Sequence, residues 1–206
     1  MLEGTGLECV RGERTLFRGL GFTVGPGELL RVAGENGSGK TSLLRIVCGL
    51  SLPAAGDVRW RGETIRRLRE DYWKDLVYVG HANALKDDLT AEENLRIGSA
   101  IAGLEPTPDE TVDALQAFGV RGCADLPARV LSQGQRRRVS LAKLAVSRSR
   151  PLWVLDEPFT ALDKAAVAHL QALIADHVAG GGAVMLTTHQ EVAIAAAVTR
   201  QLDLSA

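Results

Sequence analysis

Residues 34–41 read GENGSGKT and match the pattern G-x-x-x-x-G-K-[ST] of a phosphate-binding loop. Glycines let successive backbone N–H groups converge on an anion, and the helix that follows directs its positive end at it. Lys40 is expected to pair with the β- and γ-phosphates of a nucleotide, and the Thr41 hydroxyl to coordinate Mg²⁺. The predicted nucleotide-binding residues are Gly34, Glu35, Asn36, Gly37, Ser38, Gly39, Lys40, Thr41 and Ser42.

Two carboxylates end the apolar segment Leu152-Trp153-Val154-Leu155-Asp156-Glu157. Carboxylates at the end of a buried strand are costly unless a cation lies nearby. In a phosphate-loop protein that cation is Mg²⁺, which Asp156 would hold. Glu157, one residue further, could polarise the attacking water. The alternative is that both carboxylates only cap the turn at Pro158.

A third motif, Leu131-Ser132-Gln133-Gly134-Gln135, precedes three consecutive arginines, 136–138. Ser132 and Gln135 fit a capping box, which predicts that a helix begins here. Arginines in a first turn oppose the helix dipole by about 0.3–1 kcal/mol each if they are exposed. Either an anion or acidic partner lies nearby, or the arginines form a solvated basic face. The segment favours neither interpretation over the other.

The elements that must position these motifs are short apolar runs with helical patterns between them. The predicted strands are Leu29–Ala33, Leu76–Val79, Leu152–Leu155 and Ala183–Thr188, and the predicted helices include Thr41–Leu50 and Asp163–Val178. Their alternation predicts an α/β fold with a mostly parallel sheet. Residues 1–28 and 56–60 favour short antiparallel strands. Residues 90–150 favour helix throughout, including a capped helix that starts at Thr107-Pro108 and ends near Gly119.

His81 follows Gly80 at the end of the predicted strand Leu76–Val79. In α/β folds, ligands bind at the carboxyl ends of parallel strands, where the phosphate loop and Asp156 also lie. We therefore expect His81 near the Mg²⁺–phosphate site. Imidazole is a poor direct ligand for Mg²⁺, which prefers oxygen, so the expected contact runs through water. A solvent-facing loop histidine is the alternative.

Composition limits the class of protein. The chain has 206 residues, 46% hydrophobic content and a net charge of −1, which are values typical of one soluble domain. The near-neutral charge disfavours a nucleic-acid partner. No apolar run reaches the length needed to cross a bilayer, and the N-terminus does not favour a signal peptide. The odd cysteine count favours free thiols over a disulfide.

Taken in order along the chain, the motifs resemble those of the ATP-binding subunits of ATP-binding-cassette transporters. The phosphate loop, LSQGQ at 131–135, LWVLDEP at 152–158, the Ala161-Leu162-Asp163 that follows and the histidine of LTTHQ all occur in that family's order. LSQGQ in particular separates this family from other phosphate-loop ATPases. The resemblance covers essentially the whole chain. It implies one ATPase domain, 1–206, with a core and β-flap at about 1–80 and 151–206 and a helical lobe at about 85–150.

The resemblance also implies a mechanism that requires two copies. Asp163 would contact the second copy. Glu157 would be the catalytic base, and His189 would contact the γ-phosphate. An aromatic residue of the family usually stacks on adenine where this chain has Arg11, whose guanidinium plane can also stack; an exposed loop arginine is the alternative. The signature segment of one copy would close over the ATP of the other, through Leu131, Ser132, Gln133, Gly134 and Gln135.

Further features resemble one branch, the ATP-binding subunit of the bacterial cytochrome c maturation system. They are Val79-Gly80-His81, where the family usually has glutamine at the last position, the segment 85–95 and the block 156–163. The resemblance implies integral membrane partners, a role in haem export or haem-chaperone release, and a peripheral location on the cytoplasmic face of the inner membrane. The alternatives are another small exporter of the family and a soluble, non-transport ATPase. Both Glu157 and His189 are present, which disfavours a cassette that binds ATP without turnover.

Overall fold

Five parallel strands form the central sheet of this computed structural model, which describes residues 1–190, 192–196 and 198–204. In spatial order they are β6 (Leu76–Val79), β7 (Leu152–Asp156), β8 (Ala183–Thr187), β3 (Glu28–Ala33) and β9 (Val198–Asp203). Four of the five were predicted to within a residue or two at either end. The strand β9 was not predicted, because its polar, largely exposed residues lack the apolar run that marks the others.

Apolar side chains cover both faces of this sheet. On β7, Trp153 and Leu155 belong to one core cluster, whereas Leu152 and Val154 belong to the other. Successive side chains of a strand point to opposite faces, so a strand buried on both faces is apolar throughout. The continuous apolar runs in the sequence thus have their physical reason in this double coverage.

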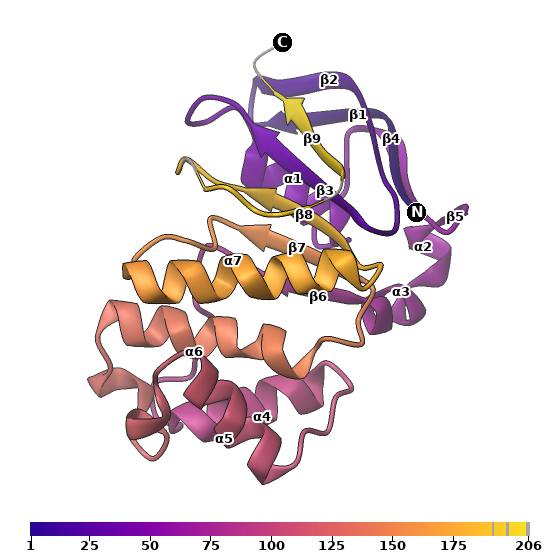
Figure 1. Cartoon of the computed structure of the whole chain (residues 1–206). Coiled ribbons are helices and arrows are strands. Elements are labelled where there is room, and N and C mark those ends of the chain that lie inside the picture. The colour runs from indigo at the N-terminus through magenta and orange to yellow at the C-terminus, as the bar shows by residue number, and fades with distance from the viewer. Residues whose placement is uncertain (191, 197, 205–206) are drawn as a thin grey trace.

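A second, antiparallel sheet packs beside the first (Figure 1). It contains β1 (Leu2–Arg11), β2 (Arg14–Val24), β4 (Ala55–Trp60) and β5 (Glu63–Thr64), in the order β2-β1-β4-β5. The expectation of short strands in this region was wrong, because β1 and β2 are 10 and 11 residues long. Register shifts interrupt the pairing of β1 with β2, and these bulges hide a long hairpin from a search for regular alternation.

Helices α1 (Lys40–Val47) and α7 (Lys164–Ala179) follow β3 and β7. The helix α1 stops before Leu50, where it was expected to end, because Gly49 adopts a positive φ of 70°. The helix α7 begins as predicted, since the Asp163 side chain accepts a hydrogen bond from the Ala166 backbone at 2.8 Å. Two short helices, α2 (Ile65–Leu68) and α3 (Glu70–Asp75), connect β5 to β6.

Helices α4 (Ala91–Ile101), α5 (Pro108–Ala117) and α6 (Gln133–Val146) gather at the end of the molecule farthest from the antiparallel sheet (Figure 1). We call them the helical lobe. Thr107 and Ser132 form the predicted capping boxes. The prediction of helix throughout residues 90–150 was wrong. Turns and two short 3-10 helices, η1 (Arg121–Cys123) and η2 (Ala128–Val130), separate the three helices.

The three cysteines, all among the described residues, are free thiols. Within the same described part of the chain, no helix has the length and apolar character that a membrane span requires.

Candidate nucleotide-binding site

A hollow of about 560 Å³ opens at the carboxyl edge of the central sheet. This volume lies in the usual range for small-molecule sites. It is bordered by the phosphate loop, by His81, by the two carboxylates at the end of β7 and by His189 after β8. We call it the nucleotide hollow, and its lining residues are Leu16, Asn36, Gly37, Gly39, Lys40, Thr41, Ser42, His81, Asp156, Glu157, Thr160, His189 and Gln190.

The phosphate loop, residues 34–41, has the backbone that its glycines predict. Gly34, Gly37 and Gly39 all have positive φ, and a Cβ at Gly39 would crowd Leu16 and Phe17. The Lys40 ammonium is largely buried and donates to the carbonyl oxygens of Gly34 and Glu35 at 2.8 and 2.9 Å. The loop therefore holds a positive charge beside the first turn of α1, as an anion site requires.

Asp156 is almost fully buried, with 1% of its surface exposed. Its Oδ1 accepts a hydrogen bond from the Thr187 hydroxyl at 2.7 Å, whereas Oδ2 has no hydrogen-bond partner among the described residues. A buried carboxylate oxygen without a partner is costly, and a cation would satisfy it. The Thr41 hydroxyl borders the same hollow. One carboxylate plus a hydroxyl fits Mg²⁺, which takes few protein oxygens and completes its shell with water and phosphate.

Glu157 has a positive φ of 47°, which costs a non-glycine residue roughly 1–2 kcal/mol. Its backbone N–H donates to Thr187 Oγ1 at 2.9 Å. Its side chain faces His189, whose backbone N–H donates to Oε2 at 3.2 Å and whose Nε2 lies 3.5 Å from Oε1. Glu157 and His189, predicted as base and phosphate contact, thus lie side by side.

His81 borders the hollow, where the topology predicted it, but it is an exposed residue, so its water-mediated contact with Mg²⁺ stays a prediction. Arg11 does not: it is exposed at the end of β1 and is not among the lining residues, whereas Leu16 from β2 is. Stacking of Arg11 on adenine therefore stays a prediction.

The signature segment, residues 131–135, lies outside the nucleotide hollow of its own chain. The Ser132 hydroxyl caps α6 by accepting a hydrogen bond from the Gln135 backbone N–H at 3.2 Å, and the Gln135 side-chain oxygen accepts one from the Ser132 backbone N–H at 2.8 Å. A Cβ at Gly134 would lie 3.1 Å from the Ala161 carbonyl oxygen, so this end of α6 packs closely on the segment that precedes Asp163.

The three arginines after the signature segment have separate partners inside the molecule. Arg136 pairs with Asp87 at 2.7 Å, and Arg138 lies 3.7 Å from Asp163. Arg137 is buried, and the hydrogen bonds that it donates to the described residues all end on uncharged oxygen atoms. Burial lowers the pKa of Arg137, while the nearby carboxylates of Asp156 and Glu157 oppose this change. The run is not a solvated basic face.

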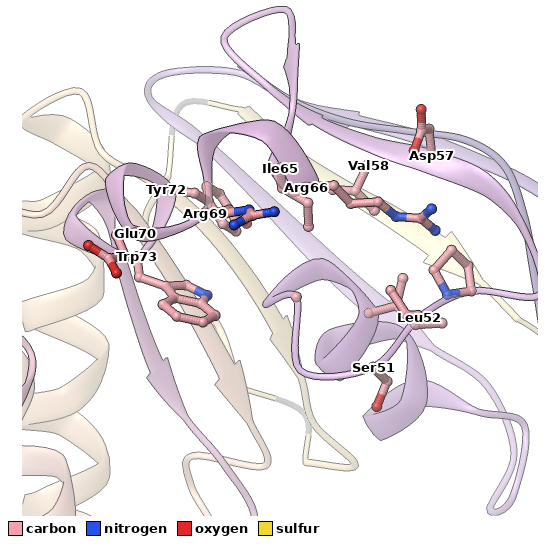
Figure 2. A pocket seen from close by; sticks show the side chains of 13 residues that line it. Ser51, Leu52, Asp57, Val58, Ile65, Arg66, Arg69, Glu70, Tyr72 and Trp73 are labelled. Carbon is pink, nitrogen blue, oxygen red and sulfur yellow. The ribbon is translucent and has the colours of Figure 1, made fainter.

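A second hollow, of about 250 Å³, lies between the end of α1 and helices α2 and α3 (Figure 2). Figure 2 shows Trp73 on one side of it and Leu52 on the other, with Arg66 and Arg69 among the lining residues. It contains none of the predicted catalytic or phosphate-binding side chains. The predicted catalytic and phosphate-binding side chains, Lys40, Asp156, Glu157 and His189, line the nucleotide hollow instead.

Comparisons with known proteins agree with this geometry. Residues 17–160 match the family described as ABC transporter. The cytochrome c biogenesis ATP-binding export protein CcmA of Nitrosomonas europaea is 54% identical over 205 residues, which cover 100% of this chain and 96% of that protein. The CcmA of Aromatoleum aromaticum is 57% identical, with coverage of 100% and 95%. The chain belongs to the CcmA family of ABC transporter proteins.

Solved structures of ABC transporter cassettes share this fold. An ATP-binding subunit of an ABC transporter has a TM-score of 0.80 at 26% identity and covers 91% of this chain and 79% of its own. A dimeric bacterial ABC transporter cassette has a TM-score of 0.84 at 23% identity, covers 99% and 95%, and shows the fold alone. Like other CcmA proteins, this chain is an ATP-binding ATPase subunit, as its motifs predicted.

Five residues in or beside the site were missed from the sequence: Leu16, Thr160 and Gln190 line the hollow, and Thr187 and Arg137 support it. Thr187 joins the backbone of Glu157 to the side chain of Asp156, and Arg137 donates to the Asp156 carbonyl at the same strand end. A polar residue at the end of the apolar run 183–187 was a signal for the threonine. For Arg137 the sequence gave no signal beyond its position in a run of three arginines.

Proposed function

We propose that the chain hydrolyses ATP in the nucleotide hollow with Glu157 as catalytic base. The observation that carries this proposal is the meeting of Lys40, Asp156, Glu157 and His189 in one hollow. Glu157 would accept a proton from the attacking water, and His189 would contact the γ-phosphate. Thr41 and Asp156 would hold Mg²⁺, and His81 would contact it through water. The ion would neutralise charge that develops on the phosphate oxygens.

The working unit would be two copies of the chain. In a single copy the nucleotide hollow would have no signature segment beside it, because residues 131–135 do not border the hollow of the same chain. Ser132 and the positive end of α6 would instead close over ATP bound to the other copy. Asp163, which follows the contact between Gly134 and Ala161, would lie at the boundary between the copies.

The chain would work on the cytoplasmic face of the inner membrane, docked to integral membrane subunits. Support comes from the names of its relatives, which are cytochrome c biogenesis export proteins. We propose that ATP hydrolysis here drives the same process, haem export or release of a haem-loaded chaperone. No nucleic-acid partner is proposed, because the chain carries a net charge of only −1.

The docking surface would be the groove between the segment after His81 and the helical lobe. We call it the docking groove. Leu85, Leu95, Gly98 and Lys143 are among its lining residues. Asp87 and Asp88, which follow Leu85, pair with Arg136 and Arg129 inside the chain, so reversing their charges would also disturb these ion pairs. The groove is therefore a more specific target for mutation than these two aspartates.

The experiment is affinity purification of the tagged chain from detergent-solubilised bacterial membranes, with mass spectrometry of the partners. We expect integral membrane proteins and, in ATP, a second copy of the chain. Recovery of ribosomal proteins or DNA in place of membrane subunits would contradict the proposal and favour a soluble ATPase.

A further inference from the structure

Arg137 joins three backbone carbonyl groups that belong to two separate parts of the fold. Its Nη1 donates to the Gly80 carbonyl at 2.9 Å, and its Nη2 donates to the carbonyls of Asp156 and Glu157 at 3.0 and 2.7 Å. A weaker contact, at 3.4 Å, reaches the Asn83 side chain. Only 4% of the Arg137 surface is exposed. A buried guanidinium with a fixed fork of donors holds such acceptors at defined positions.

The position of Glu157 depends on its backbone, which is in an unfavourable conformation. Its φ of 47° lies in the left-handed region that non-glycine residues rarely adopt. Such conformations persist only where the surroundings enforce them, and they concentrate at active sites. Here the Glu157 N–H is held by Thr187 Oγ1 and the Glu157 carbonyl by Arg137. These two hydrogen bonds fix the peptide groups on both sides of the Glu157 side chain.

The same guanidinium also contacts the segment that leads to the docking groove. The Gly80 carbonyl belongs to the peptide bond that joins Gly80 to His81. Arg137 itself lies on α6, in the helical lobe. A displacement of α6, or of the segment after His81, would therefore pull on the hydrogen bonds that hold Glu157.

We propose that Arg137 is the positioning residue that holds Glu157 in its catalytic orientation and links it to His81 and the helical lobe. It would act through the backbone and would touch neither ATP nor the attacking water. This inference rests on the proposed role of Glu157 as the base. It predicts that loss of the guanidinium slows hydrolysis without weakening ATP binding.

The test measures kcat for ATP hydrolysis, the Kd for ATP and the melting temperature of the purified chain. For Arg137→Gln we expect kcat to fall about 10- to 100-fold, with the Kd within about 3-fold of the wild-type value, because small displacements of a catalytic group have effects of this size. Arg137→Lys keeps the charge but not the fork, so it should recover part of the rate and provides a second variant if the first folds poorly.

The matched control is Arg150→Gln. Arg150 is also buried and also donates to two backbone carbonyls, those of Ala102 and Gly103. Neither of these residues lines the nucleotide hollow, whereas Asp156 and Glu157, whose carbonyls Arg137 holds, both do. Its loss should lower the melting temperature and leave kcat within about 2-fold of the wild-type value. An unchanged kcat in both Arg137 variants would overturn the proposal. So would a parallel loss of stability and ATP binding with no specific effect on kcat.

A double variant separates this inference from the proposed function. If Arg137 acts through Glu157, adding Arg137→Gln to Glu157→Gln should leave the residual rate unchanged. A further fall by the same factor would mean that Arg137 acts by another route. If Glu157→Gln alone kept the full rate, the role of Glu157 as base would fail independently of what Arg137 does.

Discussion

The Nε2 atom of His189 lies 3.5 Å from Oε1 of Glu157, and the His189 backbone N–H donates to Oε2 at 3.2 Å. These residues follow β8 and β7, which are neighbours in the central sheet. The exposed fraction is 52% for the His189 side chain and 15% for that of Glu157. The carboxylate is thus shielded from bulk water while the imidazole reaches into the hollow, which suits a base and a phosphate contact respectively.

Lys40 should dominate the affinity for nucleotide. Lys40→Ala removes the ammonium beside the phosphate loop, and a charge-assisted contact of this kind corresponds to about 10- to 100-fold in the Kd for ATP. Titration with a fluorescent ATP analogue measures it. Lys74→Ala serves as the control, since Lys74 is exposed, pairs with the nearby Asp71 and does not line the nucleotide hollow. Equal Kd values for the Lys40 variant and the wild type would contradict the prediction.

His81 should couple the hollow to the membrane partner. A glutamine oxygen can accept a hydrogen bond from bound water as a neutral imidazole nitrogen can. His81→Gln should therefore retain most of the ATPase rate and most of the partner-dependent function. His81→Ala should lose coupling to the partner more than it loses ATP affinity. If His81→Ala kept the wild-type ATPase rate and the wild-type partner-dependent function, His81 would have no role in coupling.

The docking groove can be blocked without disturbing the fold. Gly98 lies on α4 and borders the groove, and a Cβ there would meet no atom within 4 Å. Gly98→Trp should reduce co-purification of membrane subunits about 10-fold or more and leave the Kd for ATP unchanged. Gly122→Trp is the control, because Gly122 is equally open but does not line the groove. If both variants lost co-purified membrane subunits equally, the loss would not come from blocking the groove.

Stability should depend on pH through His177, which stacks on Trp153 with a centroid distance of 3.8 Å. Burial lowers the pKa of His177 to about 4, whereas the unfolded value is about 6.5. Between these values the unfolded chain binds a proton that the folded chain does not. The free energy of unfolding should therefore fall by about 2 kcal/mol from pH 7 to pH 5 through this residue.

Denaturant unfolding at both pH values measures this effect. His177→Phe keeps a flat ring against Trp153 but cannot be protonated, so its free energy of unfolding should fall less between pH 7 and pH 5. Comparing each variant with itself at the two pH values removes the packing change from the result. The same pH dependence in both proteins would exclude His177 as its source.

The sequence was informative wherever a local pattern decides the structure. The apolar runs around Val77, Val154 and Val184 predicted strands because the sheet is covered on both faces, and GENGSGKT predicted its own loop geometry. Tertiary contacts decided the rest. Consecutive residues on a helix point about 100° apart, so Arg136, Arg137 and Arg138 meet different surroundings that their shared residue type does not reveal. The exposed strand β9 was missed because its pairing partner, β3, is distant in sequence. The length of the hairpin was missed because register shifts interrupt its regular alternation.

Steady-state ATPase measurement of Glu157→Gln tests the central claim most directly. The substitution keeps the size of the side chain and its ability to accept a hydrogen bond from the His189 backbone, but it removes the basic carboxylate. We expect kcat to fall at least about 100-fold, with ATP still bound and dimers accumulating in its presence. Hydrolysis at a rate near that of the wild type would contradict the assignment of Glu157 as the catalytic base.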